Sequence, residues 1–191
     1  MAASVSSEPR VKGATINARL RWLREGNPAA LEKALASLPA ADQQVLRGQV
    51  LHISWYSLEL KRRFDNAIAE VLSPGDKPRA FREMGRAAAE INLAGPHKAY
   101  VHVGDPQALL AQAPVIFRTG NELGHREYAK TGANAAVVRT FGTGPTPGEC
   151  HTAMGWFERA IEVCGGKNVR VSEKACQSRG AEYCELACEW E

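Results

Sequence analysis

Five cysteines lie near the end of the chain, and three of them could bind a metal ion together with a nearby carboxylate. The five are Cys150, Cys164, Cys176, Cys184 and Cys188. The pattern Cys150…Glu173-x-x-Cys176-x7-Cys184 offers three thiolates and one carboxylate. Four ligands of these types are what a structural zinc ion needs for tetrahedral coordination. The sequence therefore predicts a zinc site formed by Cys150, Glu173, Cys176 and Cys184.

Spacing alone leaves a second interpretation equally open, in which all five cysteines are buried apolar side chains and Glu173 is a surface acid. His151 competes with Glu173 as a ligand, although one step along a helix turns its side chain about 100° away from Cys150. Cys188 lies about 13 Å along a strand from the nearest predicted ligand, and Cys164 lies about 21 Å along a helix from Cys150. We expect Cys164 and Cys188 to be buried core residues outside the site.

The segment before Cys150 carries several signals for the start of a helix. Thr146 can be the N-cap, Pro147 suits the first helical position, and Glu149 completes a capping box. Cys150 then falls in the first turn, where the helix dipole should lower the pKa of a thiol and favour the thiolate that a metal requires. The ligands would come from this helix start, a strand end and both sides of a turn, so the metal would join helix to sheet.

The rest of the chain is predicted to form helices followed by a small sheet. We expect helices over 15–26, 28–38, 41–50, 57–72, 78–93 and 147–164, and strands over 134–141, 168–173 and 183–190. Gly85 within its helix indicates close approach to a neighbouring element. The fold class is α+β, with helices packed on a small twisted antiparallel sheet. The expected domains are a disordered leader over 1–12, an N-terminal helical extension over 13–50 and the main domain over 51–191.

The composition is that of an ordinary globular protein, with 191 residues of which 45% are hydrophobic and 24% charged. A net charge of +3 with scattered basic residues argues against a nucleic-acid partner. The first ten residues lack the apolar core of a secretion signal, and no stretch approaches the roughly 18 apolar residues that cross a bilayer. We therefore expect a cytoplasmic protein with no membrane span, where clustered cysteines favour metal binding over disulfides.

Three late segments carry a family resemblance: Gly155-Trp156-Phe157, the run from Gly165 to Cys176, and the run from Gly180 to Cys184. They resemble the 4-vinyl reductase domain family. Related sensor domains of phenol- and xylene-responsive activators hold zinc with three cysteines and a glutamate, in the order and intervals of the four predicted ligands. The resemblance implies a fold shared with haem-based nitric-oxide sensors and vesicle-tethering subunits, an apolar pocket and frequent dimerisation.

From about Arg47 onward the chain is also similar to an uncharacterised bacterial family of ~200-residue proteins. The segments 54–58 (Ser-Trp-Tyr-Ser-Leu) and 81–85 (Phe-Arg-Glu-Met-Gly) suggest this similarity. The related activators add an ATPase module and DNA-binding helices, which this sequence lacks, so we expect output through a homodimer or an unknown protein partner. The tyrosine-serine-arginine triplet of the haem sensors is also absent, so no haem is expected.

These observations favour a non-enzymatic module that binds a small hydrophobic or aromatic molecule. The candidate pocket residues, expected on helices before the sheet and on the late helix, are Trp55, Tyr56, Phe81, Phe117, His125, Tyr128 and Trp156. Ordinary core packing is the alternative for each. Two other functions stay open: a protein-interaction scaffold of the same fold, and an enzyme acting on a small apolar substrate. The enzyme is disfavoured because catalytic and phosphate-binding motifs are missing, and because a fully protein-ligated zinc has no open position.

Overall fold

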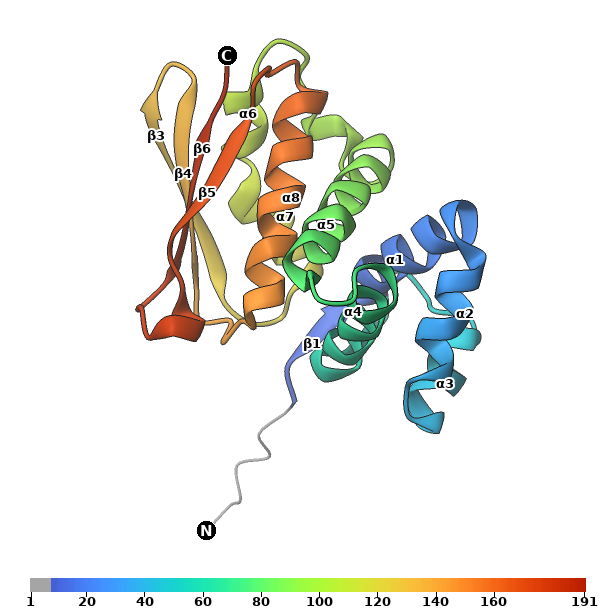
Figure 1. Cartoon of the computed structure of the whole chain (residues 1–191). Helices are drawn as coiled ribbons and strands as arrows, with labels where there is room; N and C mark the ends of the chain where they lie inside the picture. Colours follow the sequence, from blue (N-terminus) through green and yellow to red (C-terminus); the bar gives the residue numbers. More distant parts are fainter. Residues whose placement is uncertain (1–7) are drawn as a thin grey trace.

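The computed structural model describes residues 8–191 as helices packed against an antiparallel sheet (Figure 1). The first part contains β1 (Arg10–Lys12), α1 (Gly13–Gly26), α2 (Pro28–Ala36), α3 (Ala40–Arg47), β2 (Trp55–Ser57), α4 (Leu58–Leu72) and α5 (Lys77–Ala94). The second contains η1 (Lys98–Tyr100), α6 (Pro106–Leu110), α7 (Ala113–Gly120), β3 (His125–Gly132), β4 (Ala135–Phe141), α8 (Pro147–Val163), β5 (Arg170–Ala175), η2 (Gln177–Arg179) and β6 (Cys184–Glu189). The predicted α+β class is confirmed.

The helices of the first part share one apolar core, which explains why they fold together. Ile16 and Leu20 of α1 meet Phe64 and Ile68 of α4 and Met84 of α5 in this core. The spacing of three or four residues within each helix puts these side chains on one face. The core runs across residue 50, so the predicted boundary between a helical extension and the main domain does not coincide with a change in packing.

The segment predicted as a disordered leader is structured in its last residues. Residues 10–12 form β1, which pairs antiparallel with β2 in the register Val11 to Tyr56. Val11 also forms a bridge to Asn121 after α7, and Arg10 pairs with Glu122. The leader prediction is therefore wrong for residues 10–12, and its residues 1–7 lie outside the part that the structure describes.

The four-stranded sheet has the order β3-β4-β6-β5, with every neighbouring pair antiparallel. In β6 alternate residues are buried, because side chains of a strand point to opposite faces. Met154, Phe157 and Ile161 of α8 cover that buried face. Strands β4, β5 and β6 fall where the sequence predicts strands, whereas β3 was missed. The reason is that β3 is largely exposed and has no alternation of apolar residues.

Helices α5 and α8 pack closely because each presents a glycine to the other. A Cβ atom on Gly85 would lie 2.0 Å from the Thr152 carbonyl oxygen, and one on Gly155 would lie 2.0 Å from the Arg82 carbonyl oxygen. Side-chain carbons do not approach oxygens this closely, so glycine is required at both positions. The close approach predicted at Gly85 is confirmed.

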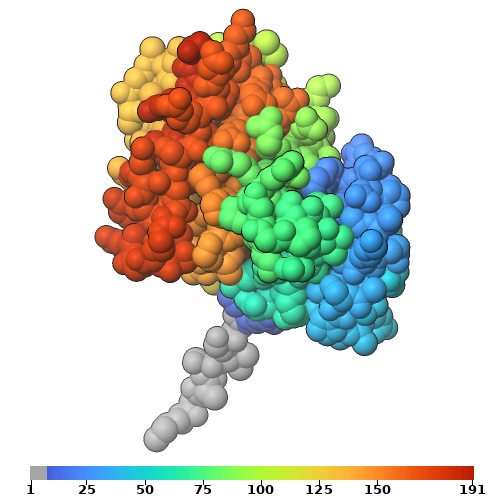
Figure 2. All heavy atoms as spheres, viewed as in Figure 1, coloured from blue at the N-terminus to red at the C-terminus, as the bar shows by residue number. Residues whose placement is uncertain are grey.

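In the space-filling view, the green surface of α4 and α5 lies between the blue N-terminal helices and the orange and red C-terminal part (Figure 2). Within residues 8–191, no helix is both long enough and apolar enough to cross a membrane.

Candidate functional site

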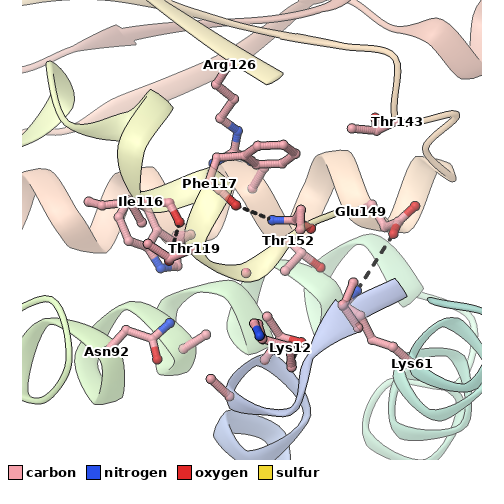
Figure 3. A pocket seen from close by; sticks show the side chains of 18 of the residues that line it. Lys12, Lys61, Asn92, Ile116, Phe117, Thr119, Arg126, Thr143, Glu149 and Thr152 are labelled. Atoms are coloured by element: carbon pink, nitrogen blue, oxygen red, sulfur yellow. Dashed lines mark hydrogen bonds and ion pairs between the residues drawn. The ribbon is translucent and has the colours of Figure 1, made fainter. Parts of the chain in front are cut away.

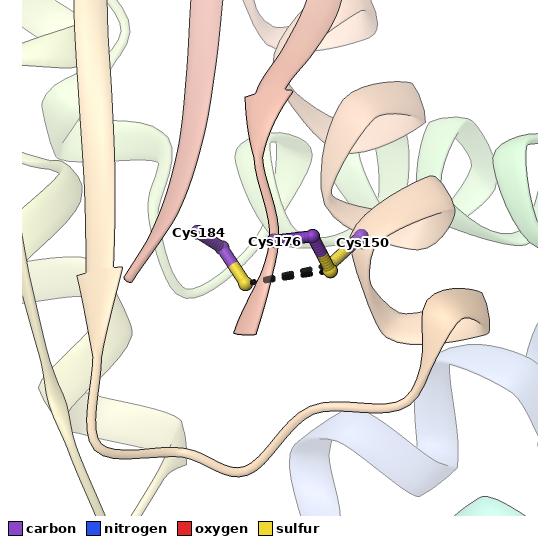
Figure 4. Close-up of side chains that lie close together, drawn as sticks. All are labelled: Cys150, Cys176 and Cys184. Atoms are coloured by element: carbon purple, nitrogen blue, oxygen red, sulfur yellow. Dashed lines mark hydrogen bonds between the residues drawn. The ribbon is translucent and has the colours of Figure 1, made fainter. Parts of the chain in front are cut away.

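Cys150, Cys176 and Cys184 form a cluster of buried thiols (Figure 4). The Sγ atom of Cys150 lies 3.3 Å from that of Cys176 and 3.6 Å from that of Cys184, and the third Sγ–Sγ distance is 3.8 Å. Sulfur atoms bound at about 2.3 Å to one tetrahedral zinc lie about 3.8 Å apart. The three sulfurs therefore already lie close to three corners of a zinc-sized tetrahedron, and small side-chain shifts would complete the fit.

Three separate elements bring these cysteines together. Cys150 lies in the first turn of α8, which begins at Pro147 as predicted, with Glu149 Oε2 accepting the Thr146 N–H at 2.8 Å. Cys176 follows β5 and Cys184 begins β6. The turn between them passes through the left-handed conformation at Gly180 (φ 87°), which favours glycine. A metal bound here would join the start of α8 to the β5–β6 hairpin.

The three thiols differ in how readily they ionise. Burial raises the pKa of Cys176, but hydrogen bonds with Ser178 and Cys150 outweigh it and leave the pKa below its usual value. Burial raises the pKa of Cys150 and of Cys184. The expectation from the sequence that the helix dipole lowers the pKa of Cys150 is therefore wrong, because desolvation is the larger effect.

The other predicted ligands lie outside this cluster. The carboxylate of Glu173, on β5, pairs with Arg179, and within residues 8–191 the group of close metal-ligating atoms at this site consists of the three cysteines alone. His151 is next to Cys150 on α8 and does not belong to the group. Cys188 is buried in the sheet core, as expected, and burial raises its pKa to about 12. Cys164, also outside the cluster, is buried as expected. The fourth ligand thus stays a prediction.

A cavity of about 540 Å³ lies beside the cysteine cluster (Figure 3). It is partly open to solvent and is lined by residues of β1, α1, α4, α5, α7, α8 and the four-stranded sheet, with Cys150 and Cys184 on its wall. Its apolar lining includes Ile116, Phe117 and Leu186. The volume falls within the range of roughly 300–1,000 Å³ typical of small-molecule and cofactor sites. The geometry places a candidate metal centre and a ligand-sized cavity against each other.

Charged residues of the helices form one side of the cavity. Asp65 of α4 lies between two cations that line it, 3.1 Å from Arg19 and 2.8 Å from Lys61. Lys61 also lies 3.8 Å from Glu149, and the dashed line in Figure 3 marks this pair. Glu149 in turn pairs with Arg62 at 3.0 Å. The network connects α1 and α4 to the first turn of α8, one residue before Cys150.

Two of the predicted pocket residues, Phe117 and Trp156, line this cavity. Of the others, Phe81 is part of the helical core. The indole of Trp55 lies under the Lys12 ammonium, 4.0 Å from it. The hydroxyl of Tyr56 accepts a hydrogen bond from the backbone N–H of Leu51 at 2.9 Å.

His125 and Tyr128 lie on strand β3 and not on a helix, because this strand was not predicted. The ring of His125 stacks on Phe141 with centroids 4.8 Å apart. The Tyr128 hydroxyl contacts the Gln107 side chain. Neither ring lines the cavity within the part of the chain that the structure describes.

Sequence reasoning missed several residues of the cavity wall, chiefly His97 after α5 and Arg126 on β3. His97 is half-buried, and burial lowers the pKa of its imidazole, so the ring is neutral at pH 7. The guanidinium of Arg126 lies 4.7 Å from the centre of the Phe117 ring. A polar residue in a turn or an exposed strand carries no periodic signal, so only the fold reveals that both residues line one cavity.

The fold is that of H-NOX proteins. An H-NOX protein from S. oneidensis in the Fe(II)NO ligation state superposes with a TM-score of 0.70 and 18% sequence identity, covering 94% of this chain and 99% of that one. A Tt H-NOX double variant gives a TM-score of 0.74 at 11% identity, covering 94% and 95%. A structure described as probing heme distortion in the H-NOX family gives 0.69 at 12% identity, covering 94% and 95%. Identities this low establish the fold alone.

These neighbours correct the expectation that no haem is involved, because proteins of this fold are described with iron and heme. The residues of the cavity are compatible with such a group in two respects. The volume is sufficient for a cofactor, and the neutral imidazole of His97 on the cavity wall is a type of ligand that haem iron accepts.

The matches lend no support to the resemblance to the 4-vinyl reductase domain or to its zinc-containing relatives. A comparison with curated protein sequences gives no match. A family model described as "Protein of unknown function (DUF2378)" matches residues 31–191. The match covers most of the chain and includes the whole cysteine cluster and most of the cavity wall. The chain therefore belongs to the DUF2378 family.

Proposed function

We propose that this protein is a non-enzymatic sensory module that binds a small, largely apolar molecule in the cavity beside a zinc ion held by the clustered cysteines. The observation that carries the proposal is the contact between the two sites, because Cys150 and Cys184 belong to the cluster and also line the cavity. The H-NOX fold supports it, since a protein of this fold is described in an Fe(II)NO ligation state and so holds a ligand.

The proposed zinc ion takes the three thiolates as ligands. Its fourth ligand in this proposal is the Glu173 carboxylate, which would have to exchange its partner Arg179 for the metal. The Gln177 N–H already points to Cys184 Sγ at 3.3 Å, and such donors stabilise a metal-bound thiolate. The ion would have a structural role, fixing one wall of the cavity. The relation to zinc-containing sensor domains is part of this proposal.

Output from the module would pass through a second copy of the chain or a protein partner, since the proposal includes no catalytic step. The alternative is a scaffold of the same fold whose cavity takes no ligand. Native mass spectrometry of the purified protein separates the two: a bound small molecule supports the sensor, and an empty cavity with a stoichiometric protein partner supports the scaffold.

The zinc site is tested by metal analysis of protein purified without chelators. We expect about one zinc per chain, as one four-ligand site requires, and loss of the metal in Cys176→Ser. Cys188→Ala is the matched control, because Cys188 is buried in the sheet core away from the cluster, and its zinc content should not change. Glu173→Gln tests the fourth ligand through a weaker zinc affinity. Unchanged zinc in Cys176→Ser would refute the site.

Haem is a second candidate for the cavity, favoured by the neighbours and by the neutral imidazole of His97. Bound haem would supply an iron centre able to take a diatomic ligand. His97 would hold the iron, and Phe117 and Leu186 would exclude water from the macrocycle's apolar surface. Addition of haemin to the purified protein should give a Soret band that shifts in His97→Ala. The same spectrum as haemin in buffer would count against this candidate.

A further inference from the structure

We propose that the preferred ligand of the cavity is an apolar molecule carrying one carboxylate, with Arg126 as the residue that binds this carboxylate. The inference rests on the proposed ligand-binding function and specifies its ligand class. Arg126 belongs to β3 and lines the cavity. In Figure 3 its side chain reaches from the strand toward the Phe117 ring, into the space between the sheet and the helices.

Arg126 differs from the other arginines of the cavity because it has no carboxylate partner. Arg10 pairs with Glu122, and Arg19 pairs with Asp65. Among residues 8–191 no carboxylate oxygen lies within 4.0 Å of the Arg126 guanidinium, and residues 1–7 contain neither aspartate nor glutamate. Its Nε donates a hydrogen bond to Thr140 Oγ1 at 3.1 Å. The guanidinium has further donors, which a ligand can use.

The Arg126 charge is held in place by aromatic rings. The guanidinium carbon lies 4.7 Å from the centre of the Phe117 ring and 5.2 Å from that of Phe157. Such cation–π contacts orient a cation without neutralising it. Burial lowers the pKa of Arg126 to about 10, which leaves the guanidinium protonated at pH 7. The Arg126 guanidinium is therefore a fixed positive charge beside the cavity. No carboxylate of residues 8–191 pairs with it.

A carboxylate complements the unpaired Arg126 guanidinium better than other polar groups do. Its two oxygens match the planar fork of a guanidinium and form two parallel hydrogen bonds with it. An amine would be repelled, and an alcohol would leave the charge uncompensated. The same cavity is also lined by Ile116, Trp156 and Leu186. These side chains suit the apolar body of an organic acid.

A different explanation must be separated from this one. Thiolates at Cys150 and Cys184 would attract Arg126, since they act to raise its pKa. Arg126 could then be the counter-ion of the metal–thiolate cluster rather than a ligand anchor. The two explanations predict different losses when Arg126 is replaced, one in ligand affinity and the other in metal affinity.

The test uses the purified 191-residue chain and two probes with the same carbon chain, decanoate and decan-1-ol, in isothermal titration calorimetry at pH 7. We expect decanoate to bind about 10- to 100-fold more tightly, as a charge-assisted hydrogen-bonded pair provides. Arg126→Gln should abolish this preference without changing the affinity for decan-1-ol. Arg126→Lys keeps the charge but loses the fork, so it should retain part of the preference. Circular dichroism and zinc content of each variant are measured alongside.

Each remaining outcome contradicts the inference. Equal affinity of the wild-type protein for both probes would overturn the carboxylate preference and leave apolar binding intact. A loss of zinc in Arg126→Gln with unchanged decanoate affinity would assign Arg126 to the metal–thiolate cluster. If neither probe binds the wild-type protein, the inference falls together with the proposed ligand-binding function. The comparison of the two probes in wild-type protein tests the carboxylate preference even where Arg126→Gln fails to fold.

Discussion

The Asp65 carboxylate is buried with only 3% of its surface exposed, between Arg19 and Lys61. Burial acts to raise its pKa, but the two cations outweigh this effect and keep the pKa below its usual value. The three groups therefore depend on one another. If the carboxylate were lost, two buried cations would face each other beside the cavity.

Asp65→Asn should reduce the free energy of unfolding by about 3–5 kcal/mol, because removing one partner leaves buried charge uncompensated. Urea denaturation followed by circular dichroism measures the change. Glu70→Gln is the matched control on the same helix, since Glu70 pairs with Lys77 at the exposed surface, and it should cost less than about 1 kcal/mol. Equal effects of the two substitutions would contradict the assigned role of Asp65.

His97 should make the stability of the protein depend on pH. Burial places its folded-state pKa below the value of 6.5 for a solvated histidine, so at mildly acidic pH the unfolded chain binds the proton more readily than the folded one. The free energy of unfolding therefore decreases as the pH falls below 6.5, the value for a solvated histidine. The full contribution of neutral His97 to stability is present only above that pH. In His97→Gln the decrease between about pH 7 and pH 5.5 should be smaller. Urea denaturation of the wild-type protein and of His97→Gln at both pH values measures these free energies. An equal decrease in the two proteins would contradict the prediction.

Single residues also show how far the sequence predicted the site. The three cysteines could be recognised because thiol clustering is a property of residue type and spacing. Glu173 was predicted as a ligand from its type and interval, and this stays a prediction, because in the structure its carboxylate pairs with Arg179, a partner that spacing does not reveal. The sequence could not identify Arg126 as a candidate ligand-binding residue. Its lack of a carboxylate partner is visible only in the three-dimensional structure.

Helices α5 and α8 form the most extensive helix–helix contact of the structure, and the glycines Gly85 and Gly155 make it possible. Alanine favours a helix over glycine by about 1 kcal/mol. A Cβ at either position, however, would lie 2.0 Å from a backbone oxygen of the partner helix, and neither backbone can yield cheaply. The clash of an added Cβ with the partner backbone therefore outweighs the higher helix propensity of alanine.

Gly85→Ala and Gly155→Ala should each destabilise the protein by about 1–3 kcal/mol, the usual cost of overpacking. Gly26→Ala is the matched control, because Gly26 ends α1 with nothing within 4 Å of its virtual Cβ. It should be neutral or slightly stabilising. Thermal melting of the three variants and the wild-type protein measures these changes. A higher melting temperature in Gly85→Ala would contradict the close helix contact.

Elements with a strong internal period were predicted well. Helix α5 was expected over 78–93 and spans Lys77–Ala94, and α8 was expected over 147–164 and spans Pro147–Val163. Their apolar stripes and caps are local properties of the chain. Strands β1 and β2 are short and pair with each other from distant parts of the chain, whereas β3 pairs with the next strand, β4, but is largely exposed and lacks apolar alternation. Neither a distant pairing nor an exposed strand leaves a periodic apolar pattern in the local sequence.

At the scale of the molecule, the cysteine cluster is the point where α8 and the β5–β6 hairpin meet. A metal bound there would connect elements that otherwise touch mainly through apolar side chains. A ligand that binds only the folded state stabilises it, by about 2.7 kcal/mol at a hundredfold excess over its dissociation constant. The folded state should therefore gain stability with rising free zinc.

We expect the melting temperature to increase with free zinc in the wild-type protein and to fall on chelation. In Cys176→Ser it should not respond to zinc, because one of the three thiolates is missing. Differential scanning calorimetry in zinc-buffered solutions measures both. A wild-type melting temperature that is independent of zinc would mean that the cluster is an ordinary part of the core.

The glycine contact between α5 and α8 also bears on the size of the molecule that the cavity could hold. Ala88 and Asn92 of α5 line the cavity, as do Ala153 and Trp156 of α8, so the glycine contact fixes the spacing of two of the helices that form its wall. A methyl group at the helix crossing would have to push the two backbones apart, so any widening of the cavity would be accompanied by a loss of stability.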